Sequence, residues 1–422
     1  MKNARVQDVD VLILGAGISG LAAAHVLSKK KNLSFAVLEA RNRIGGRIWT
    51  TSLPHGLTAE HGAEWIGATH KNLLRLCKEL GVKLETHRFP AYPYMKNGTP
   101  DPILPALLER LESVLLRTKR TRGLDKVSLL KFLNKHFSPK EVVLLRTMYS
   151  AEFAEDARYV SAIRAIVDHM TGGKNSHMDF HVVGGNTQLI TALAGAVGMH
   201  NIFLGQEVVQ ITQTSSGVVV ECASGEVWCA KKVICTLPTQ ILARTHFSPA
   251  LPKASRRAAE NLKYGNVVKV MLTFPKRFWK KENFSLFSDG LAQYVFHTTQ
   301  GQRGPAGTLC VYAVGSRAEK MRAMSMAAIW RELKKVLPKD LHTKGIAPTH
   351  MTRHVWAKDN FATGAYAVYQ PGEWARVLRA FGKPFHHVYF AGEHLATLQG
   401  FMEGAAMTGI ARAKEITQTL HV

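Results

Sequence analysis

Three glycines and one acidic residue near the start of the chain have the types and spacing needed to hold a dinucleotide. Gly15, Gly17 and Gly20 form the pattern G-x-G-x-x-G, and Glu39 follows nineteen residues after the last of them. The first glycine allows a tight turn, the second lets the backbone approach a pyrophosphate, and the third lets a helix pack closely. The carboxylate can accept hydrogen bonds from ribose hydroxyl groups. These residues predict a binding site for an anionic dinucleotide cofactor.

Two apolar runs must position these residues. Val11–Leu14 precedes the glycines and is predicted as a buried parallel strand, and Phe35–Leu38 is predicted as a second strand that ends at Glu39. The stretch after Gly17 is predicted as a helix whose N-terminal N–H groups and partial positive charge face the anion. The cofactor contacts predicted in this β-α-β unit are Gly15, Ala16, Gly17, Ile18, Ser19, Gly20, Glu39, Ala40 and Arg41.

The following loop indicates which dinucleotide fits. Gly45–Arg47 adds another close backbone approach and a guanidinium suited to a second phosphate contact, which NAD enzymes do not need. Together with Arg41 and Arg43, this loop resembles the extended motif of FAD-containing flavoproteins of the amine oxidase superfamily. The alternative is an arginine-rich surface loop. The contacts predicted from this loop are Gly46 and Arg47.

The C-terminal segment carries a second signal of the same kind. A predicted strand, Val388–Ala391, is followed by a Gly-Glu pair, and a helix is predicted from about Gly400. The N-terminus of that helix can stabilise negative charge on a flavin. The alternative is an ordinary C-terminal helix with small residues for close packing. The contacts predicted here are Gly392, Glu393, Gly400, Phe401 and Met402.

Beyond its two ends, the chain resembles the flavin-containing monoamine and polyamine oxidase family over most of its length. The similarity includes Gly184–Gly185, Glu207–Val209 and Tyr264–Lys269. It implies an α/β fold in which a Rossmann-like FAD-binding domain is interleaved with an α+β substrate-binding domain, the two-domain fold of amine oxidases and glutathione reductase. The chain is expected to come back to the flavin at residues 57–67, so that their backbone contacts it. The remaining predicted FAD contacts are Gly62, Ala63, Glu64, Trp65 and Val208.

The resemblance also implies which residues take part in catalysis. Lys269 is implied to hydrogen-bond a water at flavin N5, and Tyr366 and Phe401 to form two aromatic walls around the amine, with Trp356 nearby. A lysine between apolar neighbours is unusual if it is buried without a partner; the alternative is a strand lysine that faces solvent. For the two rings, the alternative is simple core packing. Because Ala365 stands where some monoamine oxidases attach FAD through a cysteine, FAD is expected to bind non-covalently.

The implied activity is oxidation of an amine C–N bond by hydride transfer to flavin N5, with reoxidation by O2 to H2O2. The imine is then hydrolysed to an aldehyde or ketone and ammonia or an amine. An L-amino acid oxidase-like flavoenzyme stays open: Gly62–Ile66 lacks the arginine that would clamp a substrate carboxylate, but Gly392–His394 occurs among such relatives. A flavin desaturase, which lacks the aromatic pair, and a flavin-bearing protein that binds an acidic partner are further alternatives.

Composition limits the partners and the location. The 422 residues, 46% of them hydrophobic, suit a two-domain globular protein. The net charge of +24 is dispersed along the chain, which disfavours a nucleic-acid role and predicts long-range repulsion of polycations unless the pocket mouth is acidic. The five cysteines and nineteen histidines lack disulfide or metal-ligand spacing, which favours a soluble, cytoplasmic protein without a metal site. No transmembrane segment is predicted, a small amine and O2 are the expected partners, and a homodimer is left open.

The order of predicted elements divides the chain into five segments. Residues 1–84, 181–240 and 351–422 are assigned to the FAD-binding domain, 85–180 to a helical part of the substrate domain, and 241–350 to its α+β part. Helices are predicted over 70–81, 104–116, 129–137, 140–153, 161–170 and 324–336. Strands are predicted over 267–274, 293–297 and 308–314, with antiparallel patterning over 202–235.

Overall fold

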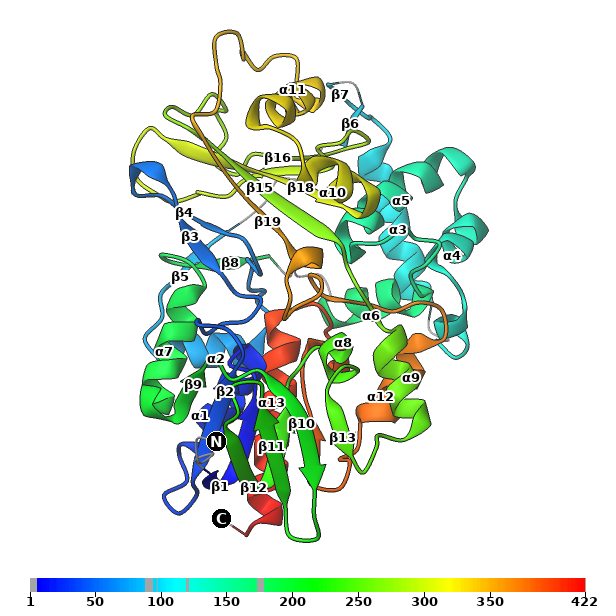
Figure 1. Cartoon of the computed structure of the whole chain (residues 1–422). Helices are drawn as coiled ribbons and strands as arrows, with labels where there is room; N and C mark the ends of the chain where they lie inside the picture. The colour runs from blue at the N-terminus through cyan, green and yellow to red at the C-terminus, as the bar shows by residue number, and fades with distance from the viewer. Residues whose placement is uncertain (1–5, 88–93, 97, 119–120, 173–177, 422) are drawn as a thin grey trace.

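Two large sheets and a group of helices organise the fold (Figure 1). The computed structural model describes residues 6–87, 94–96, 98–118, 121–172 and 178–421. Strands of the first sheet come from residues 6–39, 202–248 and 388–390, and strands of the second come from 94–100, 267–314 and 350–355. Chain segments that are far apart in sequence therefore meet in each sheet.

The first sheet has eight strands in the order β13-β10-β11-β12-β1-β2-β9, with β21 also paired to β12. Val11–Leu14 is fully buried, and its side chains alternate between two hydrophobic clusters on opposite faces of the sheet. This double burial explains why the run is apolar throughout. The strands are β1 (Val6–Leu14), β2 (Phe35–Glu39), β9 (Ile202–Leu204), β10 (Val208–Gln213), β11 (Val218–Cys222), β12 (Val227–Cys235), β13 (His246–Ser248) and β21 (Val388–Phe390).

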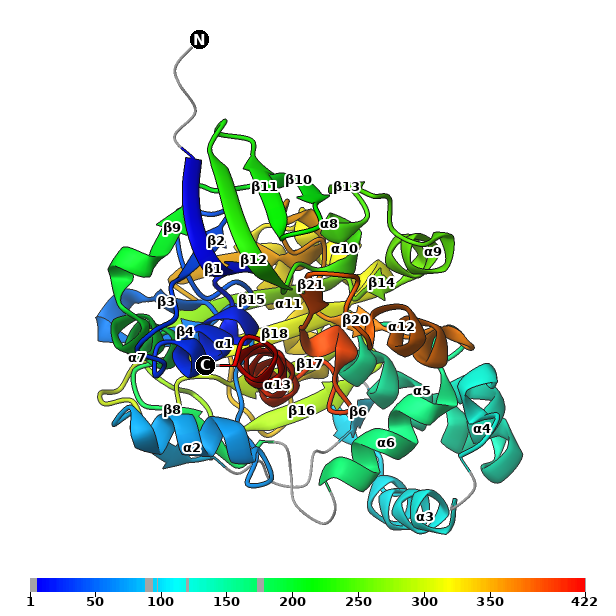
Figure 2. The same ribbon diagram turned by 90° about the horizontal axis from the view of Figure 1, so that it is seen from below.

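Four helices cover one face of this sheet. They are α1 (Ile18–Leu27), α2 (Lys71–Glu79), α7 (Thr187–Val197) and α13 (Met402–Thr419). The last helix lies beside α1 (Figure 2). A Cβ atom on Gly409 would lie only 2.0 Å from the carbonyl oxygen of Ser19, so the two helices approach closely because a glycine stands there.

The second sheet has the order β19-β15-β18-β17-β16-β6-β7. Every residue of β15 is buried. Val268, Val270 and Leu272 pack with α10 and α11, whereas Met271 belongs to a cluster on the opposite face with residues of the β3–β4 region. The elements are β6 (Tyr94–Lys96), β7 (Thr99–Pro100), β15 (Val267–Phe274), β16 (Ser285–Ser288), β17 (Tyr294–His297), β18 (Gly307–Val314), β19 (His350–Val355), α10 (Gly315–Arg322) and α11 (Met326–Val336).

A helical group with its own hydrophobic cluster lies at one side of the molecule (Figure 2). It comprises α3 (Leu104–Arg117), α4 (Leu129–His136), α5 (Pro139–Phe153) and α6 (Ala162–Gly172). The remaining helices are α8 (Thr239–Leu242), α9 (Lys253–Asn261) and α12 (Glu373–Phe381), with 3-10 turns at Pro54–Gly56, Leu124–Lys126, Met199–Asn201, Trp356–Lys358 and Glu393–Leu395. Three small sheets pair β3 (Thr50–Ser52) with β4 (Thr58–Glu60), β5 (Leu84–Thr86) with β8 (Phe180–Val182), and β14 (Lys263–Tyr264) with β20 (Ala367–Val368).

The predicted elements are present within a few residues of their expected bounds, with one difference in the first sheet. The antiparallel pattern expected from residue 202 is wrong for β9, which pairs parallel with β2. Within the same stretch, β12 pairs parallel with β1, and Lys231 on β12 forms an ion pair with Asp10 on β1 at 2.8 Å.

Neither a membrane-spanning helix nor a metal centre is found in the part of the chain that the structure describes. None of its helices has both the length and the apolar composition that crossing a bilayer requires. Among the same residues, no group of three or more His, Cys, Asp or Glu side chains is placed to hold a metal ion.

Candidate functional site

A groove runs across the carboxyl end of β1, the loop after β2 and the N-terminus of α13. It is where most of the predicted cofactor contacts meet. The predicted residues that line it are Gly15, Gly17, Ile18, Ser19, Glu39, Ala40, Arg41, Gly46, Arg47, Val208, Gly392, Glu393, Gly400, Phe401 and Met402, together with Ala365 and Tyr366. Ala16, Gly20, Gly62, Ala63, Lys269 and Trp356 are not in its described lining, and Glu64 and Trp65 line a second pocket.

The three glycines of the first turn have different surroundings. Gly15 has a φ of +103°, and a Cβ atom there would lie 2.6 Å from the Thr236 hydroxyl, which donates to the carbonyl of Leu14 at 2.7 Å. A Cβ on Gly20 would lie 1.9 Å from the carbonyl oxygen of Gly15. Beside Gly17 there is no atom within 4 Å of that position. The turn therefore closes around the first and third glycines and leaves the second facing the groove.

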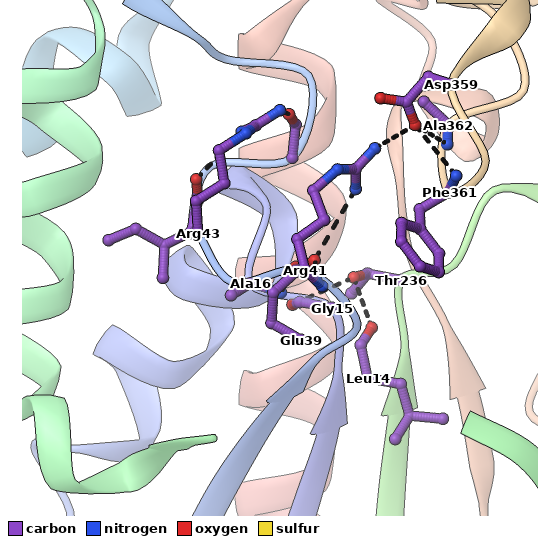
Figure 3. Close-up of polar contacts among 12 residues, drawn as sticks. Leu14, Gly15, Ala16, Glu39, Arg41, Arg43, Thr236, Asp359, Phe361 and Ala362 are labelled. Atoms are coloured by element: carbon purple, nitrogen blue, oxygen red, sulfur yellow. Dashed lines mark hydrogen bonds and ion pairs between the residues drawn. The ribbon is translucent and has the colours of Figure 1, made fainter. Parts of the chain in front are cut away.

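Glu39 and Arg41 form the acidic and basic edge of the groove (Figure 3). The Glu39 carboxylate is 4% exposed and accepts hydrogen bonds from the backbone N–H groups of Ala16, at 2.9 Å, and Arg41, at 3.0 Å. Arg41 reaches across to pair with Asp359, whose carboxylate also accepts from the backbone N–H of Phe361 at 3.0 Å. Asp359 and Phe361 were not predicted, because they lie some 320 residues away and belong to no recognisable motif.

Arg47 joins the N-terminal and C-terminal halves of the groove. Its guanidinium donates to the Glu393 carboxylate at 2.8 Å and to the carbonyl of Ala365 at 3.0 Å. Glu393 also accepts from the backbone N–H groups of Ala367 and Gly400. Burial raises the pKa of the Glu393 carboxyl, but Arg47 and the hydrogen bonds lower it more, so that the pKa lies below its usual value. The pair is charged and fixes three loops against one another.

Lys269 is buried behind the groove and has protein partners for its ammonium group. It points from the face of β15 that is turned toward β4, and it donates to the carbonyls of Glu60, at 3.0 Å, and Gly62, at 2.9 Å, and to the Glu64 carboxylate at 2.7 Å. Burial lowers the pKa of Lys269 and Glu64 raises it, with a net rise. The strand lysine is thus charged and does not face solvent.

Lys269 and Trp356 hold the 61–65 loop in place. The Trp356 indole N–H donates to the carbonyl of His61 at 2.9 Å, and the loop in turn lies against Arg47, where the Ala63 N–H donates to the arginine carbonyl at 3.1 Å. A Cβ on Gly62 would lie 1.9 Å from the same carbonyl oxygen. Gly62–Trp65 therefore supports the groove through the backbone of Arg47.

Tyr366 and Phe401 both line the groove near the N-terminus of α13. The Tyr366 hydroxyl donates to the carbonyl of Glu152 at 2.6 Å and lies 3.1 Å from the Tyr312 hydroxyl. The Phe401 ring packs edge-on against His70, with 5.5 Å between ring centroids. The contact of Tyr366 with α5 was not predicted, because a hydroxyl-to-backbone hydrogen bond carries no sequence signature.

Glu60 gives a prediction about the pH dependence of stability. One carboxylate oxygen accepts from Thr50 and from the N–H of Asn186, while the other is buried without a partner in the described part of the chain. Burial raises the pKa of Glu60 from 4.5 to about 7. The folded state therefore holds a proton that the unfolded state has released, and stability falls as pH rises through this range, by about 3 kcal/mol in total.

The Glu60→Gln variant is expected to lack this loss of stability. Urea unfolding of both proteins between pH 4 and pH 8 checks the prediction, since all other groups titrate alike. The free energy of unfolding of the variant should increase relative to that of the wild type as pH rises. If the two free energies change in parallel with pH, Glu60 does not retain its proton in the folded state.

The residues present fit a dinucleotide with two phosphates. The N-termini of α1 and α13 have no side-chain cap, and both border the groove, so their N–H groups are available to an anion. Arg41 and Arg47 also line the groove, although each is paired with a carboxylate, and the free space at Gly17 leaves room for a pyrophosphate. Two helix N-termini from opposite ends of the chain meet at the carboxyl ends of parallel strands, and this arrangement is that of a dinucleotide-binding protein.

The chain belongs to the family of flavin-containing amine oxidoreductases, whose family model matches residues 18–417. It is 27% identical over 462 residues to amine oxidase [flavin-containing] B of Sus scrofa, a match that covers 97% of this chain and 86% of the relative. It is 26% identical to amine oxidase [flavin-containing] A of Canis lupus familiaris, over 97% of this chain and 85% of the relative. The protein is therefore a flavin-dependent amine oxidase.

Solved structures show the same fold. Cyclohexylamine oxidase from Brevibacterium oxydans IH-35A superposes with a TM-score of 0.87 at 24% identity, covering 98% of this chain and 100% of the other. Putrescine oxidase superposes with a TM-score of 0.85 at 24% identity, again over 98% of this chain and 100% of the other. These matches confirm the predicted two-domain α/β fold.

Proposed function

We propose that this enzyme oxidises small amines with FAD held non-covalently in the groove, and that Tyr366 and Phe401 enclose the reacting amine. The observation that carries the proposal is the position of both rings in the groove lining, beside the N-terminus of α13. Aromatic walls exclude water and orient a bound amine. When bound, FAD supplies the redox chemistry, accepting a hydride from the amine carbon and passing the electrons to O2, which yields H2O2.

The chain's own residues orient and insulate the site. Burial, with Tyr312 close by, raises the pKa of the Tyr366 hydroxyl well above its usual value, so the hydroxyl stays protonated and acts as a fixed hydrogen-bond donor. This bond holds the ring in one orientation. The ammonium group of Lys269 has three N–H donors, and each already has a protein acceptor. A hydrogen bond from Lys269 to a water beside the flavin would therefore have to share one of these N–H groups.

The substrate class follows from family and site together. The solved relatives are named for putrescine and cyclohexylamine, and both are amines. We therefore infer that an amine, rather than an amino acid, reduces the flavin. Anaerobic mixing with monoamines, polyamines and amino acids tests this inference, with loss of flavin colour as the readout and a peroxide-coupled assay in air as the second. Colour loss with amino acids alone would support the amino acid oxidase alternative, and no response to any compound would support the desaturase or binding alternatives.

Denaturation is expected to release all FAD. Ala365 lines the groove and offers no nucleophile, and none of the five cysteines is part of the described lining. After acid precipitation the flavin should be in the supernatant, measured by its absorbance against a sample with added free FAD. Flavin that stays in the washed pellet would contradict non-covalent binding.

We also retain the predicted division into five segments, with two boundaries moved. β13 extends the first sheet past residue 240, and β19 extends the second past 350, so we place these boundaries after Ser248 and after Val355. The active protein is proposed to be soluble and cytoplasmic, to act on small molecules and to have no nucleic-acid partner.

A further inference from the structure

The loop of residues 359–363 forms one side of the cofactor groove, across from the first nucleotide-binding turn (Figure 3). Phe361 and Ala362 line the groove from this loop, and Arg41 lines it from the opposite edge. The 359–363 loop follows β19 and the 3-10 turn Trp356–Lys358, whereas Arg41 follows β2. The loop therefore brings a segment that continues the second sheet to a groove built mainly on the first.

One ion pair joins the 359–363 loop to the opposite edge of the groove. The Arg41 guanidinium pairs with the Asp359 carboxylate, and both side chains are largely buried, with 13% and 12% of their surface exposed. The guanidinium carbon also lies 5.3 Å from the centre of the Phe361 ring. An ion pair that is shielded from water is stronger than one on the open surface. Contacts between protein groups alone therefore close this end of the groove.

Asp359 also determines the shape of the loop. Its carboxylate accepts hydrogen bonds from the backbone N–H groups of Phe361, at 3.0 Å, and Ala362, at 2.8 Å. Its carbonyl oxygen accepts from the N–H of Thr363 at 2.9 Å. Asp359 itself is not part of the described groove lining. One carboxylate thus holds both the folded shape of the loop and its contact with Arg41, without contributing to the wall of the groove.

Thr363 is strained in the closed loop. Its φ is +57°, in the left-handed region that β-branched residues rarely adopt. Its hydroxyl donates only to the carbonyl of the preceding residue, Ala362, at 2.7 Å. Backbone strain of this kind persists where surrounding bonds enforce it. The bonds made by Asp359 provide that restraint, and an opened loop would let Thr363 return to an ordinary conformation.

We propose that the 359–363 loop is a gate for the cofactor, held closed by the Arg41–Asp359 ion pair and opened for FAD to enter or leave the groove. This inference rests on the proposed non-covalent binding of FAD, because a covalently attached flavin does not exchange. Asp359 acts through Arg41 and through the loop, so it is a positioning residue. The strain at Thr363 favours the open form, and the ion pair favours the closed form.

The test measures FAD exchange in both directions by flavin fluorescence: release after dilution of the holoenzyme, and association with the FAD-free full chain. Asp359→Asn keeps the shape of the side chain and removes its charge. Both rates should rise by about 10- to 100-fold, the range for a hydrogen bond between charged partners. Because opening precedes both steps, the dissociation constant should change by less than about threefold. Glu260→Gln on α9, which removes an exposed ion pair with Arg256, is the matched control and should leave both rates unchanged.

Thr363→Asn should act in the opposite direction. Asparagine adopts the left-handed conformation more readily than a β-branched residue, so the closed loop loses its strain. Both rates should fall by about fivefold. Amide hydrogen exchange is a second readout that needs neither turnover nor flavin release. The N–H groups of Phe361 and Ala362 should exchange faster in Asp359→Asn and slower in Thr363→Asn.

Three results would overturn the gate. The first is unchanged release of FAD in Asp359→Asn. The second is faster release with unchanged association, because Asp359 would then stabilise only the bound form. The third is hydrogen exchange that is the same in the wild type and both variants. If the flavin stays in the pellet after denaturation, non-covalent binding fails, and hydrogen exchange still decides whether the Arg41–Asp359 pair closes the loop.

Discussion

The Lys269→Met variant is expected to be about 3–5 kcal/mol less stable than the wild-type protein, because it leaves the buried Glu64 carboxylate without its counter-charge. Glu64 is 8% exposed and would keep only its hydrogen bond from Thr298. The carbonyls of Glu60 and Gly62 would lose a donor as well. Urea unfolding with saturating FAD, followed by tryptophan fluorescence, measures the difference in the free energy of unfolding.

The double variant Lys269→Met/Glu64→Gln is the matched control. It removes both charges, and replacement of a complete buried pair is often close to neutral. It should therefore recover most of the lost stability. A single variant as stable as the wild type would show that the pair is not buried in solution. In the recovered protein, rapid mixing separates the two half-reactions, and slower reoxidation by oxygen with unchanged reduction by the amine would support a role for Lys269 beside the flavin.

Gly17→Ala and Gly20→Ala are expected to fail in different ways. An alanine at Gly17 meets no atom within 4 Å and fits the observed φ of −76° and ψ of 176°, so the protein should fold normally. The new methyl group occupies the space assigned to the pyrophosphate, and FAD affinity should fall about 5- to 150-fold, as for an overpacked contact of about 1–3 kcal/mol. Gly20→Ala forces a Cβ to 1.9 Å from a backbone oxygen, so folding itself should suffer.

Two measurements separate these outcomes. Circular dichroism and urea unfolding without added FAD report the fold, and quenching of flavin fluorescence on titration reports cofactor affinity. Gly17→Ala should change only the second measurement, whereas Gly20→Ala should change both. Unchanged FAD affinity in Gly17→Ala would show that the pyrophosphate does not approach the turn at this glycine.

The turn and strands at the N-terminal half of the groove could be predicted from the sequence because their signals are local. The spacing of Gly15, Gly17 and Gly20 and the apolar run before them are fixed by backbone geometry within one β-α-β unit. In the structure the first and third of these glycines are closely packed, and the second lines the groove without an atom within 4 Å of its Cβ position. The end of β2 at Glu39 follows from the same local pattern.

The partners of the site residues could not be predicted from the sequence, because each of these contacts joins distant segments of the chain. Lys269 was identified by resemblance, but its bond to Glu64 joins residues 205 positions apart. Arg41 was assigned to the cofactor without its partner Asp359, 318 positions away. Residue types as common as aspartate and glutamate give no signal for such pairs until the topology brings them together.

The bonds from Arg47 to Ala365 and Glu393 have a consequence for how the protein is made. The nucleotide-binding turn is synthesised early, yet its groove is closed by residues near position 400 and by α13, which packs on α1. Before α13 packs on α1, the first strands and α1 would have an uncovered apolar face. We therefore expect cofactor capture to be a late event in biogenesis, and a chain interrupted before α13 should hold neither its flavin nor a complete core.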